Sequence, residues 1–253
     1  MIDKVKTTTA KQPTYNADDV RISYLDGRAE TIGLDSVNAA LSEVGVRITR
    51  VDIPPEAQPL LARSRYEALE IEDHNELISL FPLNRGELLD EIRLAGRQPE
   101  MHRGGFMNTT LLGGTPYPKV VDVKKIPSAE LPVFQSKMSK LHSNSSEDGV
   151  GIDEVTTILS GGESLWFFRL LDNTVVKVTI GPVDHQDKAW RISYPGLGIH
   201  GTYLDSGCGI LIAYAHGPNF FQVRYSDPSI QGAEMLGTNP WIDYSGETPI
   251  LIK

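Results

Sequence analysis

Glu154 and His200 are the two side chains in this sequence best suited to move a proton or to bind a metal ion. They lie 46 residues apart, each beside a run of residues typical of a β-strand. Imidazole titrates near neutral pH, and burial can raise the pKa of a carboxyl group toward neutrality, so the pair suits general acid–base chemistry. Both groups also bind divalent transition metals.

The elements that must position these side chains are β-strands. From residue 119 onward, runs of β-branched and aromatic residues alternate with Gly, Pro, Asp and Asn turns. Short strands at close, regular spacing predict a β-sandwich or a β-barrel. The predicted strands cover residues 120–123, 154–159, 164–170, 174–180, 190–194, 209–215 and 220–225.

Two segments of this region resemble the paired motifs of the cupin superfamily. In the first, six residues separate Glu154 from Gly161, and in the second, His200 follows Pro195 by five residues. The resemblance covers residues 118–253 and implies an antiparallel β-barrel of the jelly-roll type. Strand side chains alternate between faces, so both motifs would aim their functional groups into one cavity.

The resemblance also implies a metal site, from which this sequence departs in part. In metal-binding cupins the glutamate and histidine of the motifs, with two further histidines, hold an ion such as Fe, Mn, Ni or Zn. The implied ligands here are His142, Glu154 and His200, with Glu147 or His185 as substitutes. The family places its first two histidines at positions 147 and 149, which hold Glu147 and Gly149 here. A divalent metal and a metal-free site therefore both stay open.

Four other side chains on the predicted strands are candidates for binding a substrate. Each of the three arginines lies among apolar strand residues, and an arginine that faces inward would bind a carboxylate or phosphate group. The tyrosine belongs to an aromatic set that alternation places partly inside the barrel. These candidates are Arg169, Arg191, Tyr214 and Arg224.

Residues 1–117 have a different character, a mixed α/β pattern that is largely helical. Residues 20–25 and 46–53 alternate like short strands, and Gly45 is expected to end a helix that begins near Asp35. Leucines recur at helical spacing between positions 57 and 97, where Asn84 and Glu87 form a capping-box pattern. The sequence thus predicts an α+β protein of two parts, residues 1–117 and residues 118–253.

Composition excludes several classes of function. The net charge of −9 and the pI near 5.2 argue against binding to nucleic acid, which needs a basic surface. A single cysteine, Cys208, excludes an internal disulfide, and no apolar run reaches the length of a membrane span. The hydrolase patterns GxSxG and HExxH are absent. We expect a cytoplasmic protein whose partner is a small molecule.

These observations predict a cupin-like enzyme that acts on a small anionic or sugar-like molecule. With a metal it would be a dioxygenase, a lyase or an isomerase. Without one, Glu154 and His200 would act as the acid–base pair of an isomerase or epimerase. The alternative is a non-catalytic module that binds a small molecule or mediates assembly. We also expect a homodimer, formed through unpaired strand edges.

Overall fold

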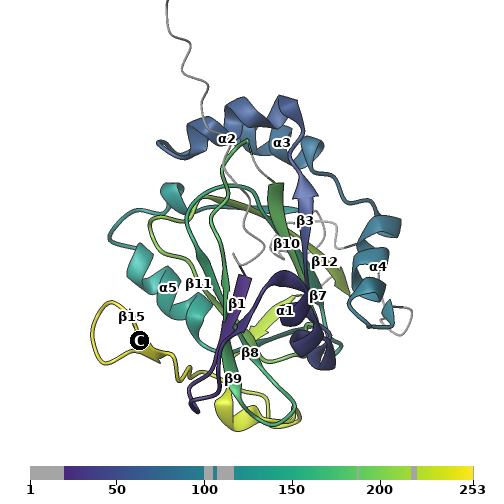
Figure 1. Cartoon of the computed structure of the whole chain (residues 1–253), viewed down its shortest axis with the longest axis vertical. Helices are drawn as coiled ribbons and strands as arrows, with labels where there is room; N and C mark the ends of the chain where they lie inside the picture. The colour runs from purple at the N-terminus through teal and green to yellow at the C-terminus, as the bar shows by residue number, and fades with distance from the viewer. Residues whose placement is uncertain (1–19, 100–104, 107–116, 187, 218–220, 253) are drawn as a thin grey trace, which may run out of the picture.

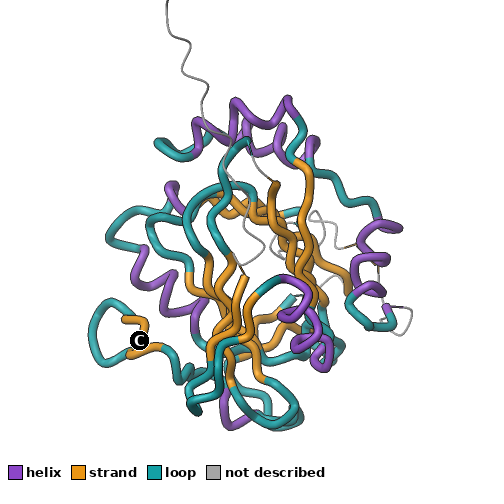
Figure 2. The backbone as a smooth tube through the Cα atoms, viewed as in Figure 1, coloured by secondary structure: helices purple, strands orange, loops and turns teal. Residues whose placement is uncertain are grey.

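The computed structural model describes residues 20–99, 105–106, 117–186, 188–217 and 221–252. Its centre consists of two antiparallel β-sheets (Figures 1 and 2). The five-stranded sheet has the order β11 (His200–Tyr203), β8 (Ser164–Arg169), β9 (Val175–Ile180), β1 (Val20–Ser23) and β2 (Thr31–Ile32). The six-stranded sheet has the order β3 (Arg47–Asp52), β10 (Lys188–Tyr194), β7 (Asp153–Ile158), β12 (Ile210–Gly217) and β4 (Gly105–Phe106), and β5 (Lys119–Asp122) also pairs with β12.

Strand pairing within the described residues does not close these sheets into the barrel that the sequence predicts. Two further strand pairs complete the β structure: β6 (Ser143–Ser145) with β13 (Gln222–Arg224), and β14 (Ile242–Asp243) with β15 (Ile250–Leu251). An isolated bridge connects His142, just before β6, to His200 at the start of β11. It is a single bridge and does not extend the five-stranded sheet. Alternation in a sequence identifies the two faces of each strand but carries no information about closure, so the expectation of a closed barrel does not hold for these residues.

Strands from both predicted parts share the same sheets. In β1, Val20 pairs with Ile180, and in β3, Arg47 pairs with Ser193. One hydrophobic core contains residues from both sides of position 117. The sequence changes character at residue 117, but both sheets contain strands from each side of that position.

The described residues form five α-helices, of which α2 and α3 lie at one end of the sheets (Figure 1). Helix α4 lies against β7, β10 and β12, and α5 lies against β11. The capping box predicted from the sequence opens α4, where the Asn84 side chain accepts from the Glu87 amide and Glu87 reaches back to the Asn84 amide. The helices are α1 (Leu34–Leu41), α2 (Gln58–Ser64), α3 (Ile71–Leu80), α4 (Arg85–Leu94) and α5 (Leu131–Ser139).

Strand β7 is buried on both faces, which places the site strand in the middle of the protein. Its residues Glu154, Thr156 and Ile158 face the other sheet, whereas Thr157 meets Arg191 on the side covered by α4. Registers with β10 and β12 set Tyr194 and Ala215 opposite Glu154. The fold therefore holds the Glu154 carboxyl between two layers of protein.

Among the described residues, no helix is long and apolar enough to cross a membrane.

Candidate functional site

A cavity of about 180 Å³ lies between the two sheets. Its wall is mostly apolar and its polar groups gather at one end, as in sites that bind small molecules. Strand alternation accounts for the lining, because residues two apart on one strand face it together: Lys119 with Val121, and Leu211 with Ala213. The lining residues are Tyr117, Lys119, Val121, Met138, His142, Asn144, Glu154, Thr156, Trp166, Tyr194, His200, Thr202, Leu211, Ala213, Phe221 and Val223.

Glu154 is the centre of a buried hydrogen-bond network. Tyr117 donates to its Oε1 at 2.7 Å, and Tyr194 donates to its Oε2 at 2.8 Å. The side-chain amide of Asn144 donates to the same Oε2 at 2.7 Å. Three donors therefore fix the orientation of the carboxyl group.

Asn144 links this carboxyl group to His200. Its Nδ2 also lies 3.1 Å from Nε2 of His200. Nδ1 of His200 lies 2.7 Å from the carbonyl oxygen of Gly198, which can only accept, so Nδ1 carries the proton and Nε2 presents a lone pair to Asn144. Oδ1 of Asn144 is buried and accepts no hydrogen bond from any of the described residues.

His142 stands beside His200 with its rings edge to face and their centroids 4.6 Å apart. Its Nδ1 lies 2.7 Å from the carbonyl oxygen of Lys140, so its proton is also on Nδ1. Nε2 of His142 forms no hydrogen bond within the described residues, and the side chain lines the cavity. The site thus holds one imidazole lone pair that is free to meet a ligand.

Burial shifts the pKa values of these groups toward their neutral forms. It raises the pKa of Glu154, against the opposing effects of its three hydrogen-bond donors and the charge of Lys119. It lowers the pKa of His142 to about 4, and lowers that of His200 well below its usual range, where the neighbouring His142 adds to the effect. The imidazoles are therefore neutral at pH 7.

Gly196 positions Asn144 through a close approach of two backbones. The backbone carbonyl oxygen of Gly196 accepts a hydrogen bond from the backbone N–H of Asn144 at 2.6 Å. A Cβ at position 196 would lie 2.2 Å from the backbone nitrogen and oxygen of Ile152 and 2.5 Å from the carbonyl oxygen of Asn144. Only glycine fits there, so the glycine after Pro195 in the second motif has a steric role in building the site.

Of the residues predicted from the sequence, the structure brings Glu154, His142 and His200 to the same cavity. The proposed substitutes for a metal ligand lie elsewhere. Glu147 is exposed in the turn after β6. His185 lies in a surface turn, where its Nδ1 is 2.9 Å from Oδ1 of Asp184. The sequence therefore led to two imidazoles and one carboxyl group of this cavity.

The four predicted substrate-binding residues are not among those that line this cavity. Arg169 donates to Asn173 in the turn between β8 and β9, and Arg224 donates to Ser145 and to backbone carbonyls near it. The Tyr214 hydroxyl donates to the carbonyl oxygen of Phe81 at 3.0 Å, on the opposite face of β12 from Ala213. These side chains serve contacts between elements.

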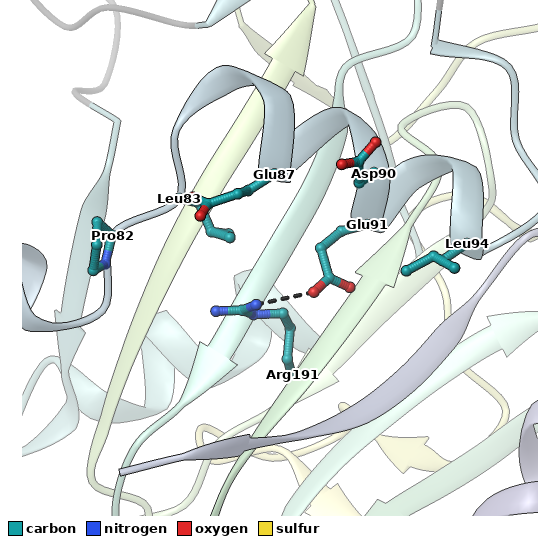
Figure 3. Close-up of a pocket in the computed structure, with 7 residues that line it drawn as sticks. All are labelled: Pro82, Leu83, Glu87, Asp90, Glu91, Leu94 and Arg191. Atoms are coloured by element: carbon teal, nitrogen blue, oxygen red, sulfur yellow. Dashed lines mark hydrogen bonds and ion pairs between the residues drawn. The ribbon is translucent and has the colours of Figure 1, made fainter. Parts of the chain in front are cut away.

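Arg191 lines a separate, open groove along α4 (Figure 3). Its Nη1 lies 2.9 Å from Oε1 of Glu91, and its Nε donates to Thr157 at 3.1 Å. Figure 3 shows Glu91 reaching down from the helix to meet the guanidinium group. Arg191 therefore joins α4 to the outer face of the six-stranded sheet.

Tyr117, Asn144 and Tyr194 contact Glu154 in this cavity, and none of the three was among the predicted site residues. Tyr117 precedes the predicted β region, and Tyr194 belongs to an aromatic set that looks like core. Asn144 had one signal: with His142 it forms a His-x-Asn pair, which resembles the His-x-His of the family with one histidine replaced. The turn between β6 and β7 moves this pair away from the spacing that the family motif gives.

The arrangement does not itself assemble a set of metal ligands. Among the described residues, no group of three or more His, Cys, Asp or Glu side chains is placed to hold a metal ion. Both oxygens of Glu154 already accept hydrogen bonds, and the Asn144 amide lies between Glu154 and His200. For Glu154 and His200 to bind one metal ion together, the side chain of Asn144 would have to rotate away from both.

Comparison with known proteins supports a cupin-like fold. No family model matches the sequence, and neither does any curated protein. Among solved structures the chain is similar to one described as acireductone dioxygenase from Bacillus anthracis with cadmium ion in active center, with a TM-score of 0.52 and 17% sequence identity. The match covers 81% of this chain and 98% of that one. That protein has the cupin fold, and the similarity concerns the fold.

Proposed function

We propose that this cupin-like protein is an enzyme that transfers protons on a small molecule, as an isomerase or epimerase does. The observation that carries the proposal is the buried link from Glu154 through Asn144 to an unprotonated imidazole of His200. A carboxyl group with a raised pKa and a neutral imidazole in one mostly apolar cavity form an acid and a base.

The groups have separate roles. For a substrate with a carbonyl group, an imidazole Nε2 removes a proton from the neighbouring carbon, and the protonated Glu154 carboxyl donates a proton to the carbonyl oxygen. An enol results, and return of the two protons to a different carbon or a different face gives the isomer. His142 offers the free Nε2, and Asn144 holds His200 and Glu154 in register.

Hydrogen–deuterium exchange tests this chemistry without a known substrate. A panel of small carbonyl compounds would be incubated with the protein in D₂O, and loss of C–H signals followed by proton NMR. We expect exchange with the wild type, and a loss of about 100-fold or more in Glu154→Gln and in a His142→Asn/His200→Asn double variant.

His185→Asn, which lies outside the cavity, is the matched control and should exchange at the wild-type rate. Equal exchange in the wild type and the Glu154→Gln variant would reject the proposal. A protein that binds compounds of the panel but exchanges none would favour the non-catalytic binding module.

A metal-dependent dioxygenase is the second candidate. Two observations favour it: the similar solved structure is a dioxygenase with cadmium in its active center, and both imidazoles here keep their Nε2 atoms unprotonated. In that reading His142, Glu154 and His200 would hold Fe, Mn, Ni or Zn, which would supply oxidation chemistry. Elemental analysis of the purified protein discriminates, because stoichiometric metal that is lost in Glu154→Gln and His200→Asn would replace the first proposal.

We further propose a homodimer joined through sheet edges, in which β2 and β3 offer unpaired strands among the described residues. The molar mass in solution, from light scattering, tests this directly.

A further inference from the structure

Lys119 is the cationic member of the cavity lining among the described residues. It belongs to β5, where it pairs with Ala213 of β12, and Ala213 in turn pairs with Thr156 of β7. All three residues line the cavity, so the Lys119 side chain starts on the cavity face of the sheet. Its place at the exposed end of β5 sets the ammonium group at the rim.

The ammonium group has no counter-ion within the described residues. Most basic side chains around the sheets are paired, as Arg97 is with Asp153 and Arg191 with Glu91. Lys119 forms no such pair, yet its charge reaches Glu154 and favours the ionised carboxylate. An unpaired cation at the mouth of an apolar cavity is a position where a ligand's negative charge is stabilised.

The rest of the cavity defines the body of the ligand. Apolar side chains flank Lys119 in the lining. Ala213 pairs with Lys119, Val121 and Leu211 follow on the side away from Glu154, and Phe221 packs against Tyr117 at the Glu154 end. The volume of about 180 Å³ is smaller than that of typical drug-binding pockets, so it fits a compact molecule. Lys119 is the one lysine or arginine among the described residues of the lining, so a second negative charge on the ligand would have no cationic side chain to meet.

We propose that the cavity binds a small organic monocarboxylate, with the carboxylate held by Lys119 at the rim, the apolar body against Ala213 and Phe221, and the other end at Glu154 and the imidazole pair. The proposal rests on the proposed function, because it names the substrate class of the same site. Lys119 is the anchor that sets this class.

The experiment compares butyrate with its neutral analogue butyramide and with butylamine, in titrations of the full chain followed by ligand-detected NMR. We expect butyrate to bind at least fivefold more tightly than butyramide, and butylamine more weakly than both. Lys119→Met should abolish the preference for butyrate over butyramide while leaving butyramide binding unchanged. Lys125→Met, at an exposed position outside the cavity, is the matched control and should keep the preference.

Equal affinity for butyrate and butyramide in the wild type would overturn the proposal, and so would a preference that survives in Lys119→Met. Because binding is measured without turnover, the two proposals fail separately. Glu154→Gln should keep the butyrate preference, since it leaves Lys119 in place. If butyrate selectivity depends on Lys119 but no proton exchange is found, only the catalytic proposal is lost.

Discussion

The side-chain nitrogen of Asn144 lies 3.1 Å from Nε2 of His200, and this contact occupies the lone pair that a metal ion would need. The same nitrogen donates to Glu154 at 2.7 Å. One side-chain amide therefore contacts both Glu154 and His200, the two groups that would have to bind a metal ion together.

Asn144→His should turn the cavity into a metal site. It would replace the blocking amide with a third imidazole beside His142 and His200, and imidazole binds Ni²⁺ and Zn²⁺ well. We expect Ni²⁺ affinity, measured by calorimetry, to rise at least tenfold over the wild type. Asn144→Gln, which keeps an amide, is the control and should show no gain. Wild-type affinity as high as that of the histidine variant would show that Asn144 does not block the site.

Acid should destabilise the protein through His142. Burial lowers the pKa of this imidazole to about 4, whereas the unfolded chain has a value near 6.5. As the pH falls from 6.5 to 4, the unfolded state takes up a proton that the folded state does not. The free energy of unfolding therefore falls by up to about 3 kcal/mol as the pH falls through this window. Above pH 7 the imidazole is neutral in both states, and the protein keeps this part of its stability in full.

Urea unfolding of the wild type and His142→Gln at pH 7, 6, 5 and 4.5 measures this effect. We expect the difference in stability between the two proteins to shrink steadily as the pH falls. A constant difference would mean that His142 titrates alike in the folded and unfolded states.

Gly196→Ala should strongly destabilise the fold. The added Cβ would lie 2.2 Å from the backbone of Ile152, and backbone cannot move aside as a flexible side chain can. We expect a loss of about 3 kcal/mol or more in the free energy of unfolding by urea. Gly86→Ala, in the exposed first turn of α4, is the control: its Cβ would lie 3.2 Å from the side-chain oxygen of Asn84, which can shift, so the change in stability should stay within about 1 kcal/mol. Similar stabilities for the two variants would contradict the close approach at Gly196.

The buried ion pair of Arg97 and Asp153 should behave non-additively. Nη1 of Arg97 lies 3.2 Å from Oδ1 of Asp153, and both side chains are buried. Arg97→Met removes the guanidinium group that faces the buried carboxylate of Asp153 and should cost about 3–5 kcal/mol. Adding Asp153→Asn should recover part of that loss, which a double-mutant cycle in urea would measure. If the two losses simply add, the pair contributes no coupling energy.

The sequence predicted the strands of the site well because their signal is local. Alternation and turn residues located β7, β8, β9, β10 and β12 to within a few residues. The spacing of the two motifs then led to Glu154 and His200, which do line one cavity. Helix α5 was missed, because it lies inside a region of β character and only Pro132 near its start indicates a helix.

The other parts of the site depend on long-range pairing, which spacing along the chain does not reveal. Tyr117 reaches Glu154 from outside the predicted β region, and Lys119 faces the cavity because of its register with β12. The candidate arginines looked suitable because each lies on a strand among apolar residues. Helices such as α4 also bury the outer face of these strands. An arginine among apolar strand residues can therefore face either the cavity or a helix.

The pairing of β1 with β9 and of β3 with β10 has a consequence for biosynthesis. Val20 leaves the ribosome long before Ile180, its partner, has been made. At ordinary elongation rates the delay is roughly ten to thirty seconds. During that time the partners of β1 and β3 in the two sheets, β9 and β10, are missing, and neither sheet can be completed until the last third of the chain has been synthesised. Nascent chains stalled before residue 180 should therefore be protease-sensitive and should recruit chaperones, whereas the finished chain should not.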